Sequence, residues 1–462
     1  MVPFRRLSLY SYFRISKPSS AEVPQEHVDA EYKRLRNRTF WGVTAAYCLY
    51  YVCRMAISVV KQPVVDGGVM SPAQIGLVDS ALLLVYAIGK FCNGFIADYC
   101  NVRRFMAVGL VVSSLVNLVM GALGLLHGWL GLSTMLIFFL FALVWGINGW
   151  AQSMGAPPAV ISLSRWFPLK SRGTFYSILC ATPYLGKSVS MILIGHVVLW
   201  LGWQYGFIVA ALCGFIGSLI IYFFVSDTPE RKGLPSVQTL SGEEPRKADS
   251  IPTRELHMAV LRHPGIWVIA LSSAFVYITQ YGISSWGIFF LQKAKGYALT
   301  DAAGIVAVSE GIGVVGTVVA GWLSDRVFRG NRLRPVILCG VVCLVTLALF
   351  LLTGGGFIVN VVFLSVASLT LAALYCIVSG LMALDIVPRK ATGAALGVVG
   401  ISSYAAAALQ STVSGVLIET SSTGGQAYDF TPVAWFWIVS CLVSFLLPAL
   451  CWPMLRRKVA DF

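Results

Sequence analysis

Long apolar runs alternate with short polar segments along almost the whole chain. Each run reaches about 20 residues, the length that an α-helix needs to cross a bilayer. The apolar positions are continuous within a run, whereas the strands of a membrane β-barrel alternate. The pattern therefore predicts an all-α polytopic membrane protein with twelve transmembrane helices. The predicted spans lie near residues 39–60, 76–97, 106–126, 133–155, 174–200, 205–225, 264–292, 300–324, 335–353, 357–384, 392–418 and 433–454.

One long polar stretch interrupts this pattern. Residues 226–263 hold six basic and six acidic residues and show no apolar periodicity, which is typical of a linker. The linker separates two sets of six spans. We therefore expect an arm at 1–38, a first six-helix bundle at 39–225, the linker at 226–263, a second bundle at 264–455 and a tail at 456–462.

The composition agrees with a membrane protein and excludes other classes. Hydrophobic residues make up 57% of the chain and charged residues only 12%, against about 25% charged in an average soluble domain. The mean hydropathy is +0.78. The 11 cysteines are scattered through the apolar runs, which excludes a small disulfide-stapled module.

Basic residues concentrate in alternate loops, as the positive-inside rule requires. With the arm, linker and tail in the cytoplasm, inner segments hold 28 of the 34 basic residues. An anionic inner leaflet then explains the net charge of +14, and a nucleic-acid partner has no other support. The first 38 residues are polar and basic, so we expect no cleavable signal before the first span; the layout fits a bacterial inner membrane, and a eukaryotic internal membrane is the alternative. Lys61, Lys293 and Lys295 fall outside, and Arg54, Lys90 and Lys187 are left within spans.

A local sequence pattern occurs once in each half. GFIADYCNVRRF follows the second span and GWLSDRVFRGNR follows the eighth, each the second span of its half. Both copies place an aspartate, Asp98 or Asp325, at a helix end before a short basic turn, where it can meet arginine side chains. Two copies at equivalent places indicate two pseudo-symmetric bundles, one of which can rock against the other.

The paired pattern resembles the signature loop of the major facilitator superfamily. Further segments, among them AYCLYYVCRMAI, VYAIGKFCNGFIAD, NGWAQSMGAPP and LDIVPRKATGAALG, resemble the organophosphate:phosphate antiporters, which include glycerol-3-phosphate and hexose-6-phosphate transporters. The resemblance implies a central cavity between the halves and alternating access. It also implies exchange of a phosphorylated sugar, hexose 6-phosphate before glycerol 3-phosphate, for inorganic phosphate by a monomer. Two alternatives stay open: a membrane receptor that signals to a kinase, and a proton-coupled symporter.

Arg54 is the first candidate ligand for such a substrate. An arginine inside a span costs about 2.5 to 3.5 kcal/mol unless it faces protein or water, so its presence needs a reason. A guanidinium matches two phosphate oxygens, and the phosphate-binding arginine of the family falls on this position. The alternative is a structural ion pair with Glu310 or Asp79. Tyr47 and Tyr51 share the helical face of Arg54, and the resemblance places both in the cavity; packing is the alternative.

The remaining candidates come from other spans. Tyr86 and Lys90 are spaced i and i+4 in the second span, where Lys90 either faces the cavity or extends to the cytoplasmic surface. Gln280 stands where the family carries a second arginine. We therefore expect Lys187, in the fifth span, to supply the missing cation, and we disfavour its pairing with an acidic residue because few lie at membrane depth.

Two further residues are expected to act during the conformational cycle. Glu310 either neutralises and releases a cation or carries a coupling proton. Trp150 either covers the cavity or packs in the core. The sequence shows no phosphate-binding loop, metal-ligand cluster or catalytic Ser/His/Asp grouping, so we expect no enzyme activity and no cofactor.

Overall fold

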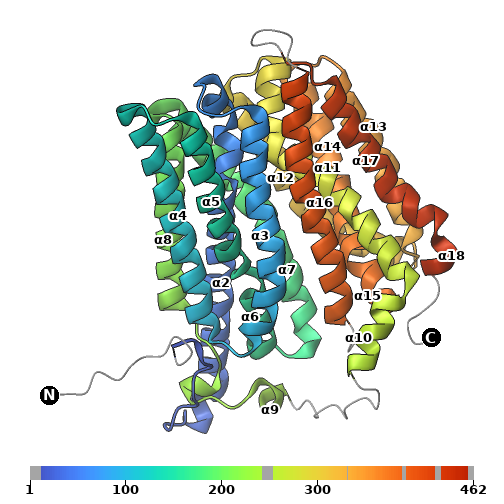
Figure 1. Cartoon of the computed structure of the whole chain (residues 1–462). Coiled ribbons are helices and arrows are strands. Elements are labelled where there is room, and N and C mark those ends of the chain that lie inside the picture. The colour runs from blue at the N-terminus through green and yellow to red at the C-terminus, as the bar shows by residue number, and fades with distance from the viewer. Residues whose placement is uncertain (1–11, 242–252, 330, 388–391, 422–427, 456–462) are drawn as a thin grey trace.

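The computed structural model describes residues 12–241, 253–329, 331–387, 392–421 and 428–455 (Figure 1). Twelve of the described helices are long and apolar enough to cross a membrane, which confirms the predicted number. These are α2 (Val28–Asp66), α3 (Pro72–Asp98), α4 (Val102–Leu130), α5 (Thr134–Ser153) with α6 (Ala156–Trp166), α7 (Leu169–Leu201), α8 (Trp203–Phe224), α11 (Pro264–Lys295), α12 (Leu299–Trp322), α13 (Leu333–Leu352), α14 (Phe357–Cys376), α16 (Thr392–Thr420) and α17 (Thr431–Leu450).

The helices form two halves, α2–α8 and α11–α17, which stand side by side (Figure 1). Three pairs of helices meet across the boundary: α2 packs against α11, α3 against α16 and α7 against α12. We call the end of the bundle that carries the short linker helices α9 (Val237–Ser241) and α10 (Thr253–Arg262) the linker side, and the opposite end the far side. The linker thus contains helical turns, although its sequence predicts none.

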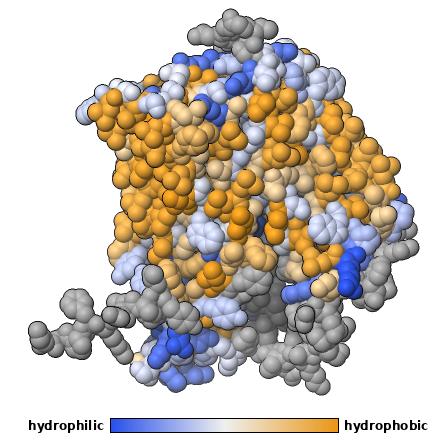
Figure 2. Space-filling model, viewed as in Figure 1, coloured by the Kyte–Doolittle hydropathy of each residue, from blue (hydrophilic) through white to orange (hydrophobic). Residues whose placement is uncertain are grey.

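Apolar side chains dominate the outer surface between these two ends. Figure 2 shows a broad hydrophobic band around the helices, with hydrophilic residues gathered toward the linker side and the far side. Such a band matches the hydrocarbon core of a bilayer, where a helix satisfies its own backbone hydrogen bonds. The protein is therefore a multi-pass membrane protein.

The first spanning helix is longer at both ends than the apolar run predicts. It begins at Val28 rather than near residue 39, because its polar first turns pack against the linker side, where Tyr32 Oη donates to the carbonyl of Trp166 at 2.6 Å. It continues to Asp66, beyond the predicted end at residue 60. Lys61, which the charge pattern placed in an outer loop, therefore lies inside the helix and is buried.

Polar caps and chain-breaking residues set several helix ends. The Ser71 side chain accepts from Gln74 N, and the Gln74 side chain accepts from Ser71 N, which forms a capping box at the start of α3. Between α5 and α6 the chain breaks at Gly155, because the prolines that follow it lack the N–H needed inside a helix.

Polar contacts between the halves close the far side. Ser80 Oγ donates to Ala408 O at 2.6 Å, and Ala73 N donates to Glu419 Oε2 at 2.9 Å. There α3 and α16 approach so closely that a Cβ added to Gly415 would lie 2.4 Å from a backbone oxygen of α3. We call these α3–α16 contacts the far-side seal. Within the described ranges, hydrogen bonds and ion pairs between the halves lie at mid-depth or on the far side.

Candidate functional site between the halves

Arg54 lies at mid-depth on α2, where it is buried. Its Nε donates to Gln152 Oε1 at 3.3 Å, and its guanidinium carbon lies 4.8 and 4.2 Å from the ring centres of Tyr51 and Tyr86. Its Nη1 is buried and has no hydrogen-bond partner among the described residues. A buried donor without an acceptor costs about 1 to 3 kcal/mol or more, so this atom is suited to a ligand.

The two carboxylates that could have neutralised Arg54 pair with other cations. Asp79 Oδ2 lies 3.1 Å from Lys61 Nζ, and Glu310 Oε2 lies 2.8 Å from Lys187 Nζ. No ion pair of Arg54 is found in the described part of the chain. The structure therefore does not show the ion pair with Glu310 or Asp79 that was the alternative explanation for Arg54.

Lys90 is a second cation without a described carboxylate partner. Its Nζ lies 4.9 Å from the ring centre of Tyr404, and the rings of Tyr404 and Tyr86 are 4.6 Å apart. Because Tyr86 also contacts Arg54, the tyrosine pair connects the two cations. Tyr47 packs edge-to-face against Tyr51 at 5.5 Å. The structure thus brings together Arg54, Lys90 and the three tyrosines singled out in the sequence, and it adds Tyr404, which no sequence motif had indicated.

Lys187 lies beside Gln280, but it pairs with an acidic residue, so our expectation about its partner was wrong. Besides Glu310, Lys187 Nζ contacts Ser284 Oγ at 3.2 Å, and Gln280 Nε2 lies 3.1 Å from the same hydroxyl. The reason is tertiary: α7 and α12 belong to different halves and pack together, which brings Lys187 to Glu310. A buried ion pair of this kind crosses the boundary between the halves.

Lys61 and Asp79 form a second buried ion pair, which the sequence analysis missed. Lys61 Nζ donates to Ser285 Oγ at 2.5 Å, and Asp79 Oδ2 accepts from Ser411 Oγ at 2.9 Å and from Ser285 Oγ. Since the serines belong to α11 and α16, the pair joins the halves beside the far-side seal. The available signal was its spacing: Lys61 follows Arg54 by seven residues and shares its helical face.

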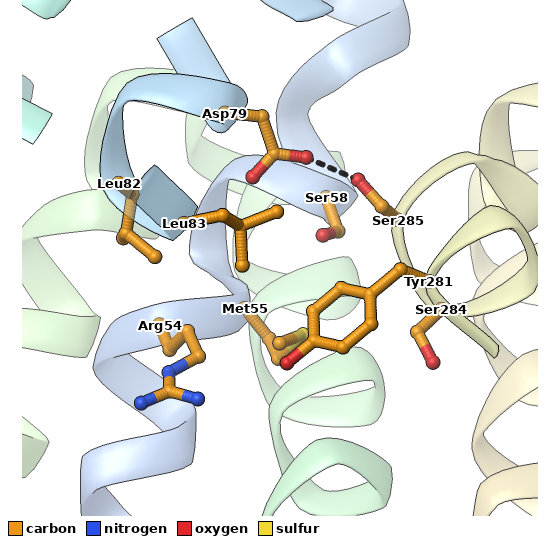
Figure 3. Close-up of a pocket in the computed structure, with 9 residues that line it drawn as sticks. All are labelled: Arg54, Met55, Ser58, Asp79, Leu82, Leu83, Tyr281, Ser284 and Ser285. Atoms are coloured by element: carbon orange, nitrogen blue, oxygen red, sulfur yellow. Dashed lines mark hydrogen bonds between the residues drawn. The ribbon is translucent and has the colours of Figure 1, made fainter. Parts of the chain in front are cut away.

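A small pocket lies between Arg54 and this ion pair, with room for about one water molecule. Figure 3 shows Arg54 at one end and Asp79 at the other, with Tyr281 reaching in from α11. One Asp79 oxygen is bonded to Ser285, and the carboxylate borders the same space as the guanidinium. The pocket is lined by Arg54, Met55, Ser58, Asp79, Leu82, Leu83, Tyr281, Ser284 and Ser285.

Three other residues singled out in the sequence do not take part in this pocket as described. Trp150 is 40% exposed, which does not fit packing in the core, and it is not among the residues that line this pocket; its role as a cover of the cavity stays a prediction. The side chains of Asp98 and Asp325 lie outside the described residues. On the linker side, Asp227 pairs with Arg165 at 2.6 Å and accepts from Val102 N at 2.9 Å, and Asp385 pairs with Arg332 at 2.7 Å.

No group of three or more His, Cys, Asp or Glu side chains that could hold a metal ion is found among the described residues. Between the halves, charged side chains instead form two buried ion pairs, and two further cations, the buried Arg54 and the half-buried Lys90, face aromatic rings without a described carboxylate partner. Such an arrangement suits an anionic ligand between the halves.

Comparison with known proteins identifies the family. Residues 43–411 match the model of the Major Facilitator Superfamily. The glycerol-3-phosphate transporter of Bacillus subtilis is 30% identical over 95% of this chain and 97% of its own. A probable hexose phosphate transport protein of Chlamydia pneumoniae is 31% identical over 70% of this chain and 71% of its own. The membrane sensor protein UhpC of Escherichia coli is 26% identical over 83% of this chain and 86% of its own.

The fold comparison agrees. An inward-facing, unoccupied bacterial homolog of the human lysosomal transporter Spinster superposes with a TM-score of 0.71 over 93% of this chain and 98% of its own, at 17% identity. The chain therefore belongs to the major facilitator superfamily and, within it, to the organophosphate:phosphate antiporter family.

Proposed function

We propose that this protein exchanges a phosphorylated sugar or glycerol 3-phosphate for inorganic phosphate by alternating access. The observation that carries the proposal is Arg54, a buried arginine with a free Nη1 and no described carboxylate partner. Nearby, Lys90 is a second cation without a described carboxylate partner, and it lies over the ring of Tyr404. A phosphate monoester carries about two negative charges above its second pKa near 6, which two cations match.

Exchange follows from the charge of the empty site. Lys61 and Lys187 are neutralised by Asp79 and Glu310, so Arg54 and Lys90 leave two positive charges between the halves. A carrier whose charged site must cross the low-dielectric interior moves more readily when an anion fills the site. Binding of ester on one side and of phosphate on the other then drives the two half-cycles.

The substrate class is supported by the relatives, whose names include glycerol-3-phosphate and hexose phosphate transporters. In this proposal the site lacks a two-arginine clamp, because Gln280 stands where the family carries the second arginine. Gln280 bonds to Ser284 beside the pocket, and Lys90 acts as the second cation. Lys187 compensates Glu310 and is released only when the halves separate. The linker side, the termini included, faces the cytoplasm of a bacterial inner membrane, and the protein works as a monomer.

Counterflow into liposomes tests the proposal. Purified protein is reconstituted with inorganic phosphate inside, and uptake of labelled glucose 6-phosphate and glycerol 3-phosphate is followed. We expect uptake that requires internal phosphate and fails in liposomes loaded with sulfate. Binding of an ester without any flux would instead indicate a sensor, the role named for the UhpC relative. Flux driven by a pH gradient without internal phosphate would indicate a proton-coupled carrier that uses Glu310.

A further inference from the structure

A chain of buried polar side chains runs from Arg54 into the first half. Gln152 Oε1 accepts from Arg54 Nε at 3.3 Å, and Gln152 Nε2 donates to Ser113 Oγ at 2.7 Å. Ser113 Oγ in turn donates to Asn148 Oδ1 at 2.6 Å. All four side chains are at least nine-tenths buried. The chain connects α2, α5 and α4. Asn148 and Gln152 lie in the segment NGWAQSMGAPP, but among the four residues only Arg54 was a candidate ligand in the sequence analysis.

The direction of these hydrogen bonds is fixed by the arginine. A guanidinium only donates, so the Gln152 oxygen must face it. The Gln152 amide nitrogen then points to Ser113, whose hydroxyl accepts this bond and donates its own hydrogen to Asn148. With its amide held at both ends, Gln152 has one favoured orientation.

Close helix packing brings Gln152 to this place. A Cβ added to Gly149, three residues earlier on α5, would lie 2.3 Å from the backbone oxygen of Leu82 on α3. Gly89 of α3 leaves room for the Ser153 side chain of α5, whose Oγ would lie 2.4 Å from a Cβ added there. The two glycines let α3 and α5 pack closely, and Gln152 of α5 reaches Arg54 on α2.

We propose that Gln152 is a positioning residue, which holds the Arg54 guanidinium by its Nε edge and leaves the Nη edge and the full charge to the substrate phosphate. The inference rests on the proposed function, in which Arg54 binds the anion. A glutamate would reach the same atoms, but its carboxylate would form a charge-assisted ion pair with Arg54 and compete with phosphate. A neutral amide orients the arginine without neutralising it.

The test compares Gln152→Glu with wild type by isothermal titration of inorganic phosphate into purified protein. We expect the affinity to fall about 10- to 100-fold, since a charge-assisted bond must be given up for each phosphate bound. Gln410→Glu is the matched control, because Gln410 is equally buried but bonds to Ser414 within the second half. We expect phosphate affinity within about threefold of wild type in correctly folded Gln410→Glu protein.

A second variant separates positioning from a structural role. Gln152→Ala keeps the charge of Arg54 but frees its orientation, so KM for exchange should rise several-fold while the maximal rate stays within about twofold. In an Arg54→Lys background, which lacks the guanidinium Nε, Gln152→Ala should cause no further loss of phosphate affinity, which a double-mutant cycle measured by titration calorimetry detects.

The outcomes keep this inference apart from the proposed function. Equal phosphate affinity of wild type and Gln152→Glu, or additive effects in the cycle, would overturn the role of Gln152 and leave exchange intact. If wild-type protein binds neither phosphate nor any phosphate ester, the proposed function itself is wrong, and the role of Gln152 is wrong with it.

Discussion

Four cationic side chains lie between the halves, three of them buried and Lys90 half-buried. All four lie over aromatic rings. They differ in their acidic partners: Lys61 and Lys187 each contact a carboxylate, whereas within the described ranges Arg54 and Lys90 contact no acidic group. A cation over an aromatic face keeps its charge while it loses part of its hydration, which leaves it ready for an anion. Loss of an unpaired cation should therefore weaken anion binding, whereas loss of a paired cation should leave a carboxylate unpaired and lower stability.

Replacement of Arg54 by lysine should nearly abolish exchange while the protein still inserts. Lysine keeps the charge but cannot offer two parallel N–H groups to phosphate, so we expect phosphate affinity to fall at least about tenfold. Titration calorimetry on the detergent-purified protein measures the change. Arg38→Lys is the control, because Arg38 is exposed and bonds only to the Phe223 carbonyl among its described partners. Wild-type affinity in Arg54→Lys would remove Arg54 from the site.

Loss of Lys187 should act through stability, because it leaves Glu310 charged and unpaired in the interior. We expect Lys187→Met to destabilise the protein by about 3 to 5 kcal/mol, seen as a lower melting temperature. Adding Gln280→Arg should restore most of the loss, since Gln280 Nε2 already lies 3.5 Å from Glu310 Oε1. Gln410→Arg in the same background is the control and should restore nothing. An unaltered melting temperature in Lys187→Met would show that the pair contributes little.

Single residues also show which parts of the candidate site can be predicted from the sequence. The cost of an arginine in a span makes Arg54 a candidate ligand without any structure, and helical spacing predicts that Tyr51 lies on the same face. The partner of Lys187 was not predictable, because it depends on how α7 packs against α12 of the other half. Lys61 was misplaced for a related reason: an ion pair inside the membrane lets the helix continue past the end of its apolar run.

At the scale of helices, α11 connects the two ion pairs. Its adjacent serines, Ser284 and Ser285, point to different partners: the first contacts Lys187 and Glu310, and the second contacts Lys61 and Asp79. In the proposed alternating-access cycle, opening of the far side separates α11 from α2 and α7 and breaks these contacts. The Lys61–Asp79 pair stays within the first half, whereas the Lys187–Glu310 pair crosses the boundary and would break.

Weakening of the far-side seal should be visible in backbone hydrogen exchange. Ser411→Ala removes a hydrogen bond from α16 to the Asp79 carboxylate, so we expect the amides of residues 72–83 and 408–420 to exchange about fivefold faster. Ser414→Ala is the matched control. It lies on the same helix but bonds to Trp437 and Gln410 of its own half. Equal exchange in both variants would mean that the Asp79 contact does not hold the far side closed.

At the scale of the whole molecule, the proposed function implies that the two cations without a carboxylate partner determine which phosphate species binds. A monoester passes from about −1 to −2 around its second pKa near 6. Ordinary lysines and arginines stay protonated below pH 8. We therefore expect affinity for the ester to fall about fourfold from pH 7.5 to 5.5, in step with the dianion fraction. Calorimetry at several pH values measures it.

Lys90→Gln provides the control for this pH dependence. With one cation removed, the preference for the dianion should weaken and the affinity curve should flatten, although binding becomes weaker at every pH. If wild-type affinity did not depend on pH, Lys90 would not act together with Arg54, and the site would hold a single effective charge.

The overall architecture was readable from the sequence to a large degree. Twelve apolar runs and the linker predict twelve helices in two sets, because the bilayer admits few other solutions. The closure of the far side was not readable. It depends on backbone approach at Gly76 and Gly415, where hydropathy indicates only that small residues are present.

Two of the four cations between the halves are paired with carboxylates and two are not. This difference determines how much net charge crosses the membrane during transport. An empty carrier would move the charges of Arg54 and Lys90 through the membrane field, at about 2.3 kcal/mol for each elementary charge fully crossing 100 mV. A dianion in the site cancels both charges, so exchange of one dianion for another transfers no net charge. Exchange should therefore run equally fast with or without a potassium diffusion potential imposed by valinomycin. A rate that follows the imposed voltage would show that the loaded site carries residual charge, and then a further group among the four cations and two carboxylates must change its pairing during transport.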